Sequence, residues 1–153
     1  MEEQRIKFRQ YVLADRDYIL EIYDAAARIS GKFLDEDSRN RDRANMEEYI
    51  DKLETETIVV ELNAQTVGFA SFIHPTSLGG FYIKPEVQGQ GIGRALMKYI
   101  QDGRKEIELA VYKKNWKAVR FYRRNGFHKT KSVKSPLQEQ EYFVMIWKGK
   151  QLR

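Results

Sequence analysis

The apolar residues of this chain recur at spacings that change between strand-like and helix-like periods. Weak alternation over Lys7–Leu13 predicts a first or edge strand. Asp15 then precedes an apolar stripe at helical spacing, which predicts a helix that Asp15 caps and that ends at Ser30-Gly31. A second stripe predicts a helix from Arg41 to about Glu54, and the charged segment Lys32–Asn40 is expected to be a mobile connection between the two helices.

The middle of the chain has the alternation of an antiparallel sheet. The runs Thr57–Leu62 and Val67–Ile73 predict two strands that are joined by a hairpin turn at Asn63-Ala64-Gln65. After a turn at His74–Ser77, the run Leu78–Ile83 predicts a fourth strand. In the Val67–Ile73 strand, the alternation assigns one face to Val67, Phe69, Ser71 and Ile73.

The C-terminal half alternates helices and strands. Its predicted elements are a helix over Ile92–Ile100, a strand over Ile107–Tyr112, a helix that Asn115 caps and that ends at Asn125-Gly126, and strands over Lys129–Lys134 and Glu141–Lys148 joined by a loop at Ser135–Gln140. The whole order is β-α-α-β-β-β-α-β-α-β-β, with no internal repeat or linker. It predicts an α/β (α+β) fold in a single domain over residues 1–153.

Composition excludes several classes of protein. With 42% hydrophobic and 32% charged residues the chain is typical of a globular protein. No apolar run approaches the roughly 20 residues that span a bilayer, and the polar start Met1–Arg5 does not resemble a secretory signal, so a cytoplasmic protein is expected. The absence of cysteine excludes disulfides and thiolate chemistry, and a metal site built on only His74 and His128 is not expected.

The net charge of +5 has three interpretations. Basic residues gather in Lys113–Arg124 and Lys129–Lys134, which could contact nucleic acid or simply face solvent. We favour solvent exposure for most of them and expect no nucleic-acid partner. The third interpretation, that cations attract the phosphates of a ligand, applies best to Arg94 and Arg124.

The segment Gln88–Arg94 carries the most specific chemical signal. Its three glycines separate a strand-like run from an amphipathic helix, so unblocked N–H groups meet the positive end of a helix dipole, a geometry that binds phosphate. A P-loop would need Lys and then Ser or Thr where Arg94-Ala95 stands, and a dinucleotide fingerprint would need Gly or Ala at Arg94. The spacing that fits is Gln-x-x-Gly-x-Gly, with Gln88, Gly91 and Gly93 at its defining positions.

A second segment carries a motif that belongs with the first. Residues Asn115–Phe127 read Asn-x-x-Ala-x-x-Phe-Tyr-x-x-x-Gly-Phe, and both segments resemble signatures of the GNAT superfamily of N-acetyltransferases, in the same order. The last strand, Tyr142–Trp147, is similar to small bacterial members of the YjaB-like kind. The resemblance implies a twisted, mostly antiparallel sheet of about seven strands with about four helices, splayed between the fourth and fifth strands where the cofactor lies.

The resemblance also implies a site for acetyl-CoA. The backbone of Phe81, Tyr82 and Ile83 would pair with the pantetheine arm, and a backbone N–H near Phe81 would act as oxyanion donor. Asn115 would hydrogen-bond the same arm, and Tyr122 would protonate the departing thiolate, since a phenol stays protonated at neutral pH. The pyrophosphate would lie on the loop formed by Gln88, Gly89, Gln90, Gly91, Ile92, Gly93 and Arg94.

The general base stays unassigned. Related enzymes use a glutamate near the start of the fourth strand, where Ser77 stands here. His74, Glu61 and Glu108 are the remaining candidates, and none is preferred.

The leading hypothesis is direct acetyl transfer, in a ternary complex, to a primary amine of a small molecule. By resemblance the acceptor pocket would draw on six aromatic residues, Tyr18, Tyr23, Phe33, Tyr49, Tyr142 and Phe143. Acetylation of a protein N-terminus or lysine, and a non-catalytic acyl-CoA sensor, are the alternatives. The chain is compatible with a homodimer, and no metal or membrane partner is expected.

Overall fold

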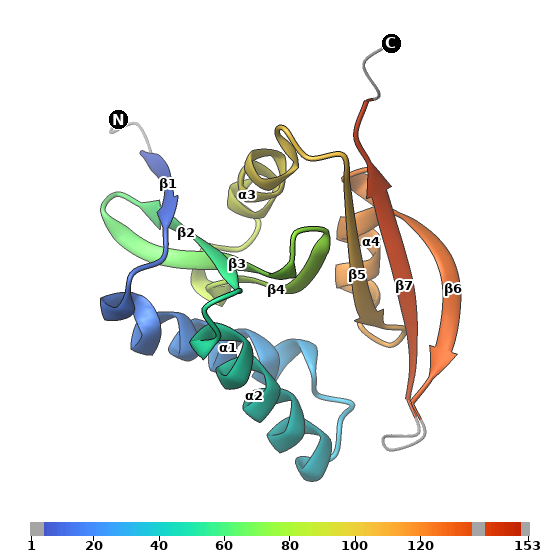
Figure 1. Cartoon of the computed structure of the whole chain (residues 1–153). Coiled ribbons are helices and arrows are strands. Elements are labelled where there is room, and N and C mark those ends of the chain that lie inside the picture. The colour runs from blue at the N-terminus through green and yellow to red at the C-terminus, as the bar shows by residue number, and fades with distance from the viewer. Residues whose placement is uncertain (1–4, 136–139, 151–153) are drawn as a thin grey trace.

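The computed structural model describes residues 5–135 and 140–150. Within them the strands form one sheet in the order β1-β2-β3-β4-β5-β7-β6, antiparallel throughout except for the parallel pair β4 and β5 (Figure 1). The strands are β1 Ile6–Gln10, β2 Glu56–Leu62, β3 Gln65–His74, β4 Ser77–Ile83, β5 Glu106–Tyr112, β6 His128–Lys134 and β7 Glu141–Lys148. The helices are α1 Arg16–Ser30, α2 Glu36–Asp51, α3 Ile92–Gln101 and α4 Trp116–Arg124. This mixed, mostly antiparallel sheet confirms the predicted fold class.

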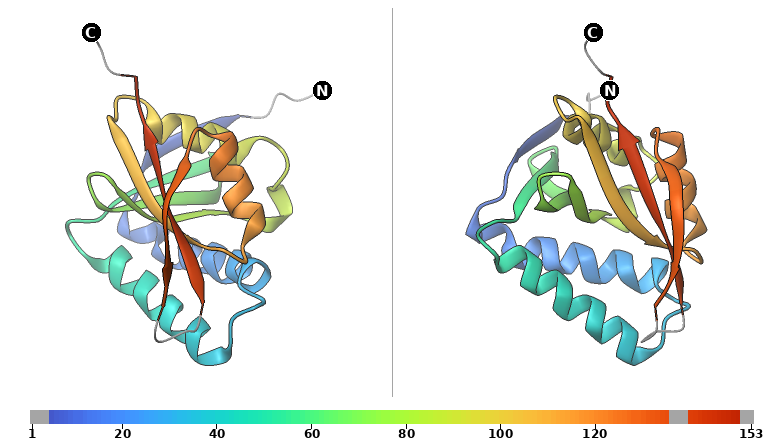
Figure 2. Two further views of the ribbon diagram at one scale, coloured as in Figure 1. Left: turned by 90° about the vertical axis from the view of Figure 1, so that its right-hand side faces the viewer. Right: turned by 45° about the vertical axis from the view of Figure 1, so that its right-hand side comes forward.

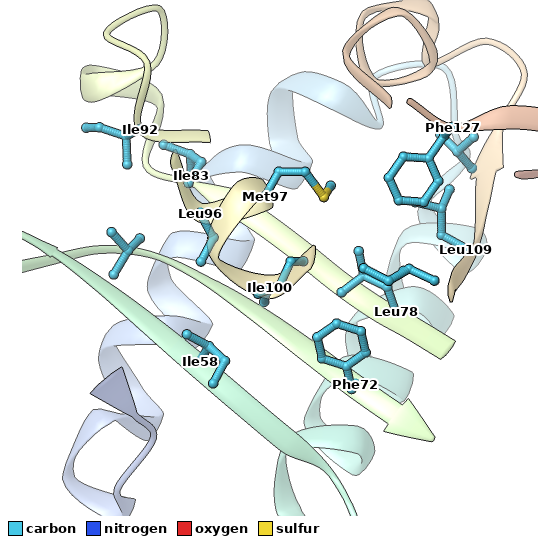
Figure 3. Packing of buried hydrophobic residues seen from close by; sticks show 14 of the residues in the cluster. Ile58, Phe72, Leu78, Ile83, Ile92, Leu96, Met97, Ile100, Leu109 and Phe127 are labelled. Carbon is cyan, nitrogen blue, oxygen red and sulfur yellow. The ribbon is translucent and has the colours of Figure 1, made fainter. Parts of the chain in front are cut away.

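Helices cover both faces of the half-sheet β1–β4. Figures 1 and 2 show α1 and α2 on one face and α3 on the opposite face, while α4 lies beside β5, β7 and β6. The buried face of α3 contributes Leu96, Met97 and Ile100 to a core against the strands (Figure 3). A second core joins Tyr23 of α1 and Met46 of α2 to the other face of the sheet. Burial of these apolar stripes fixes both helix layers on the sheet.

The prediction that Val67 and Phe69 lie on the same face of β3 is wrong. Val67 packs in the core beneath α3, whereas Phe69 packs in the core beneath α1 and α2. The β2–β3 register shifts between Val60 and Glu61, so one β3 residue lacks a partner and the alternation moves by one. A bulge of this kind reverses the faces of the residues on one side of it, and the periodicity of one strand does not reveal it.

Two predicted boundaries near the N-terminus also change. The first strand ends at Gln10 rather than Leu13, because the chain then makes a short 3-10 turn. The Asp15 carboxylate does not cap α1; it accepts hydrogen bonds from the Arg9 guanidinium at 2.7 and 2.8 Å and from the Val12 N–H. These bonds instead join β1 to the start of α1.

Helix α2 begins earlier than predicted. It starts at Glu36 rather than Arg41, so the end of the expected connection Lys32–Asn40 is helical. Asp35 caps this helix by accepting a 2.7 Å hydrogen bond from the Ser38 N–H. Acidic residues in the first turn complement the helix dipole, which the apolar stripe alone did not indicate.

The hairpin between β6 and β7 is closed by a 2.8 Å hydrogen bond from the Ser135 N–H to the Gln140 carbonyl. The rest of the predicted loop, residues 136–139, lies outside the described residues, as does most of the N-terminal segment Met1–Arg5.

The parallel pair β4 and β5 separates almost at once. Ser77 and Glu108 are its single pair in register, supported by a 2.7 Å bond from the Glu108 N–H to the Thr76 carbonyl. By contrast, β5 and β7 pair at every position from Glu106 to Tyr112. The sheet therefore splays between β4 and β5, as the resemblance implied, and leaves one edge of β4 without a strand neighbour.

Candidate active site

A cavity of about 1530 Å³ occupies the wedge between β4 and β5. Its walls come from the diverging strands, from the glycine turn before α3 and from the start of α4. The side away from α3 is formed by the end of α1, by the connection to α2 and by the first turns of α2. Segments far apart in sequence thus meet around one volume.

The glycine turn leads from β4 into α3, as the sequence predicted. Gly89 and Gly91 have φ values of 83° and 84°, in the left-handed region that favours glycine. Gly91 is the N-cap residue directly before α3, and no side chain of the described residues caps this helix. The first helical bond runs from the Ala95 N–H to the Gly91 carbonyl, so the N–H groups of the preceding turn have no intrahelical acceptor.

The space beside the turn is open. A Cβ built on Gly89 or Gly91 would meet no atom within 4 Å. At Gly93 a Cβ would touch the Phe121 ring at 3.4 Å, so this glycine serves the packing of α3 against α4. First-turn N–H groups that have no acceptor within the helix, at a helix N-terminus beside open space, fit an anionic ligand such as a pyrophosphate.

Most of the predicted cofactor residues line this cavity. They are Phe81, Tyr82, Ile83, Gln88, Gly89, Gly91, Gly93, Arg94, Asn115 and Tyr122. Gln90 is exposed and Ile92 is buried in the core beneath α3, and neither lines the cavity. Only the backbone of Ile92 could contact a ligand there.

Gln88 has a role that its motif position alone did not specify. Its side-chain Nε2 donates a 2.9 Å hydrogen bond to the Ile83 carbonyl at the end of β4. The bond ties the turn to the strand edge, so the two surfaces predicted to hold opposite parts of the cofactor keep a fixed relation.

Tyr122 lies on α4 among aromatic rings. Its ring packs edge-on against Phe81, Phe121 and Phe127. Burial raises the pKa of its phenol well above the ordinary value, so the hydroxyl is protonated at neutral pH. A protonated phenol on the cavity wall can donate a proton to a leaving group.

Asn115 begins α4, as predicted, by accepting a 3.4 Å hydrogen bond from the Ala118 N–H through Oδ1. The helix ends at Arg124, and the chain turns away at Gly126, where φ is 91° and a Cβ would lie 2.9 Å from the Trp147 ring. Arg94 and Arg124 both line the cavity on the side of the glycine turn and α4. The conformations at Asn115 and Gly126 explain why this motif needs those residue types.

The aromatic residues expected around the acceptor separate into two groups. Tyr23 and Phe33 line the cavity, whereas the other four, Tyr18, Tyr49, Tyr142 and Phe143, do not. Tyr18 projects into solvent with 62% of its surface exposed. For those four residues the expected place on the cavity wall is wrong.

The three candidate bases also lie off the cavity wall. Glu61 accepts a 2.6 Å hydrogen bond from the Arg9 Nε, on the side of the sheet occupied by β1. Glu108 and His74 are exposed. The structure places no carboxylate or imidazole of these residues beside the predicted thioester position.

Two carboxylates that the sequence did not single out do line the cavity within the described ranges, Asp24 and Asp42. Asp24 accepts hydrogen bonds from Arg43. Asp42 accepts a 2.8 Å hydrogen bond from the Tyr112 hydroxyl, which connects α2 to the end of β5. Asp42 is 70 residues away from Tyr112, and a charged helix such as α2 offers no sequence signal for this contact.

Within residues 5–135 and 140–150, none of the helices is long and apolar enough to cross a membrane. In the same ranges, no group of three or more His, Cys, Asp or Glu residues is arranged to hold a metal ion.

Comparisons with known proteins agree with this geometry. Residues 23–145 match the family model described as acetyltransferase (GNAT) domain. The peptidyl-lysine N-acetyltransferase YiaC of Escherichia coli strain K12 is 32% identical over 89 residues, which are 58% of this chain and 61% of YiaC. The chain therefore matches less than two thirds of that relative's length.

Solved structures resemble the whole arrangement. The solution structure of apo YjaB from Escherichia coli has a TM-score of 0.82 at 21% identity, covering 95% of this chain and 99% of YjaB. The PaiA N-acetyltransferase of Thermoplasma acidophilum, solved with coenzyme A, has a TM-score of 0.71 at 20% identity, covering 95% of this chain and 99% of PaiA. At these identities the likeness concerns the fold.

Proposed function

This chain belongs to the GNAT acetyltransferase family, and from that premise we propose that it transfers the acetyl group of acetyl-CoA to a primary amine of a small molecule. The observation that carries the proposal is the shared cavity. A glycine turn at a helix N-terminus, an open strand edge and a protonated phenol line one volume between β4 and β5. Phosphate binding, pantetheine binding and proton donation need those three features.

Different residues of the cavity bind different parts of the cofactor. The first-turn N–H groups of α3 and the side chains of Arg94 and Arg124 hold the phosphates. The open edge of β4 at Phe81–Ile83 pairs with the peptide-like arm, and Asn115 donates from its amide. Bound acetyl-CoA supplies an activated acetyl thioester.

The chemical step exchanges one bond for another. The acceptor nitrogen forms a bond to the acetyl carbon as the carbon–sulfur bond breaks, and a backbone N–H near Phe81 stabilises the oxyanion. The nitrogen then releases its extra proton to water. Tyr122 gives its phenolic proton to the departing sulfur and regains one from solvent. Deprotonating an alkyl ammonium at pH 7 costs about 4–5 kcal/mol, so the attacking species is the small neutral fraction of the amine.

One observation favours a second candidate. YiaC, which shares 32% identity over 89 residues, is named as a peptidyl-lysine N-acetyltransferase. Acetylation of a protein lysine therefore stays an alternative, and an acyl-CoA sensor without catalysis is the other.

A thiol-release assay separates these functions. The protein is incubated with acetyl-CoA and, separately, with amino acids, polyamines, aminoglycosides or lysine peptides, and products are identified by mass spectrometry. Release of thiol with a small amine and formation of its N-acetyl product support the proposal. Release only with peptides supports the alternative, and binding of acetyl-CoA without release from any acceptor supports the sensor.

A further inference from the structure

We infer that the acceptor is a small amine that also carries an anionic group, a carboxylate or a phosphate. The inference rests on the proposed acetyl transfer and adds the charge of the second substrate. Its ammonium group lies against Asp42, and its anionic group lies against Arg28, Lys32 and Arg39. These residues lie on α1, on α2 and on the connection between them, the part of the cavity wall away from the glycine turn.

The ammonium end is built around a positioned carboxylate. The Tyr112 hydroxyl donates to Asp42 Oδ2 at 2.8 Å, and Phe33 packs edge-on against the Tyr112 ring with 5.5 Å between centroids. Tyr23 of α1 and Tyr82 of β4, which both line the cavity, form a second edge-on pair with 4.9 Å between centroids. A carboxylate near several aromatic rings is a favourable environment for an ammonium ion.

Asp42 acts on these phenols electrostatically. Burial is the largest cause of the raised pKa of Tyr23 and of Tyr82, and the negative charge of Asp42 raises both further. Both phenols therefore stay neutral at neutral pH, and Asp42 is a negative charge near enough to act on each of them.

Cations outnumber anions on the same wall. Arg28, Lys32 and Arg39 line the cavity and are exposed, and within residues 5–135 and 140–150 none of them forms an ion pair. Arg28 is one turn after Asp24 on α1, and Arg39 is three residues before Asp42 on α2, so each cation shares a helix face with a carboxylate.

Charge decides which amines suit this wall. A polyamine or a lysine-rich peptide would bring further positive charge to a wall on which cations outnumber carboxylates, which costs binding energy. An amine with a carboxylate or phosphate would meet charges of opposite sign at both ends. The cations near the glycine turn, Arg94 and Arg124, belong to α3 and α4 and serve the cofactor instead.

Matched acceptors test the inference. We compare 4-aminobutyrate with butylamine, and O-phosphoethanolamine with ethanolamine, at saturating acetyl-CoA, with putrescine as a dication. The anionic member of at least one pair should have a kcat/KM about tenfold higher, as expected for one or two partly exposed charge contacts. The pair with the larger ratio identifies carboxylate or phosphate as the preferred group.

Variants assign that preference to residues. The double variant Arg28→Gln/Arg39→Gln should reduce the ratio to about twofold or less, whereas Arg120→Gln, an exposed arginine on α4 outside the cavity wall, should leave it unchanged. Asp42→Asn should raise KM for every amine in the set. Calorimetry with acetyl-CoA and melting temperatures verify that each variant is folded and binds the cofactor.

The inference is overturned if butylamine or putrescine is preferred to both anionic acceptors, or if the double variant weakens acetyl-CoA binding and leaves the ratio intact. In either case the proposed acetyl transfer would stand. If acetyl-CoA binds but no amine or peptide is acetylated, the proposed function itself fails.

Discussion

Two glycines at opposite ends of α3 allow the phosphate-binding turn to be tested against a matched control. Gly91 begins the helix with φ of 84°, and Gly103 follows its end with φ of 78°. A Cβ at either position would meet no atom within 4 Å. Gly91 lines the cavity between β4 and β5, and Gly103 does not. We therefore compare Gly91→Leu with Gly103→Leu.

The two variants should cost similar stability and differ in binding. Holding an L-residue in the left-handed region costs roughly 1–2 kcal/mol, and neither site adds a clash with the protein. At Gly91 the new side chain enters the space beside the first-turn N–H groups of α3. Loss of one or two hydrogen bonds to a charged phosphate, at about 1.5–3 kcal/mol each, weakens acetyl-CoA binding by a factor of roughly ten to a hundred or more.

Urea denaturation measures the stability of each variant, and isothermal titration calorimetry measures its affinity for acetyl-CoA. The free energies of unfolding of the two variants should agree within about 0.5 kcal/mol, and Gly103→Leu should bind acetyl-CoA as the wild type does. Equal acetyl-CoA affinity in Gly91→Leu and Gly103→Leu would refute the assignment of the phosphates to this turn.

Three further predictions concern single side chains. Tyr122→Phe should lower kcat by about a hundredfold or more with little change in acetyl-CoA affinity, while Tyr99→Phe, outside the cavity, should leave kcat intact. Because burial raises the pKa of Tyr122, the wild-type rate should show no alkaline decline from this group below about pH 10. Gln88→Ala should weaken acetyl-CoA binding severalfold by releasing the turn from β4, at a cost of about 1 kcal/mol in stability, and unchanged affinity would argue against this positioning role. Asp15→Asn should destabilise the fold by about 2–3 kcal/mol at pH 7. The hydrogen bond from Arg9 lowers the pKa of Asp15, so this stability is present above about pH 4 and is lost as pH falls through the lowered pKa. Equal acid sensitivity of the wild type and the variant would contradict this prediction.

Residues whose type is fixed by the local backbone conformation or by a helix cap were predictable from the sequence. Gly126 must adopt positive φ beside a tryptophan ring, and Asn115 caps the helix that follows it. Gly91 sits where a strand-to-helix turn needs the left-handed conformation. Because each constraint acts within a few residues, spacing was enough to locate these motifs, and their resemblance to known signatures indicated the family.

Features that depend on tertiary contact were not predictable. Asp42 lies among charged residues of α2, where it looks like part of a solvated helix face, and only the fold brings it to Tyr112. The face of Val67 depends on a register shift opposite β2. Tyr18 and Tyr49 looked suitable for a pocket because aromatic composition carries no information on direction.

Amide hydrogen exchange with and without acetyl-CoA tests most directly whether the wedge between β4 and β5 binds the cofactor. We predict slower exchange over the strand edge Phe81–Ile83 and over the turn Gln88–Arg94, with the Gly103 turn and the edge strand β6 unchanged. Protection confined to the basic surface of β6, or no protection of the turn at saturating acetyl-CoA, would contradict the account.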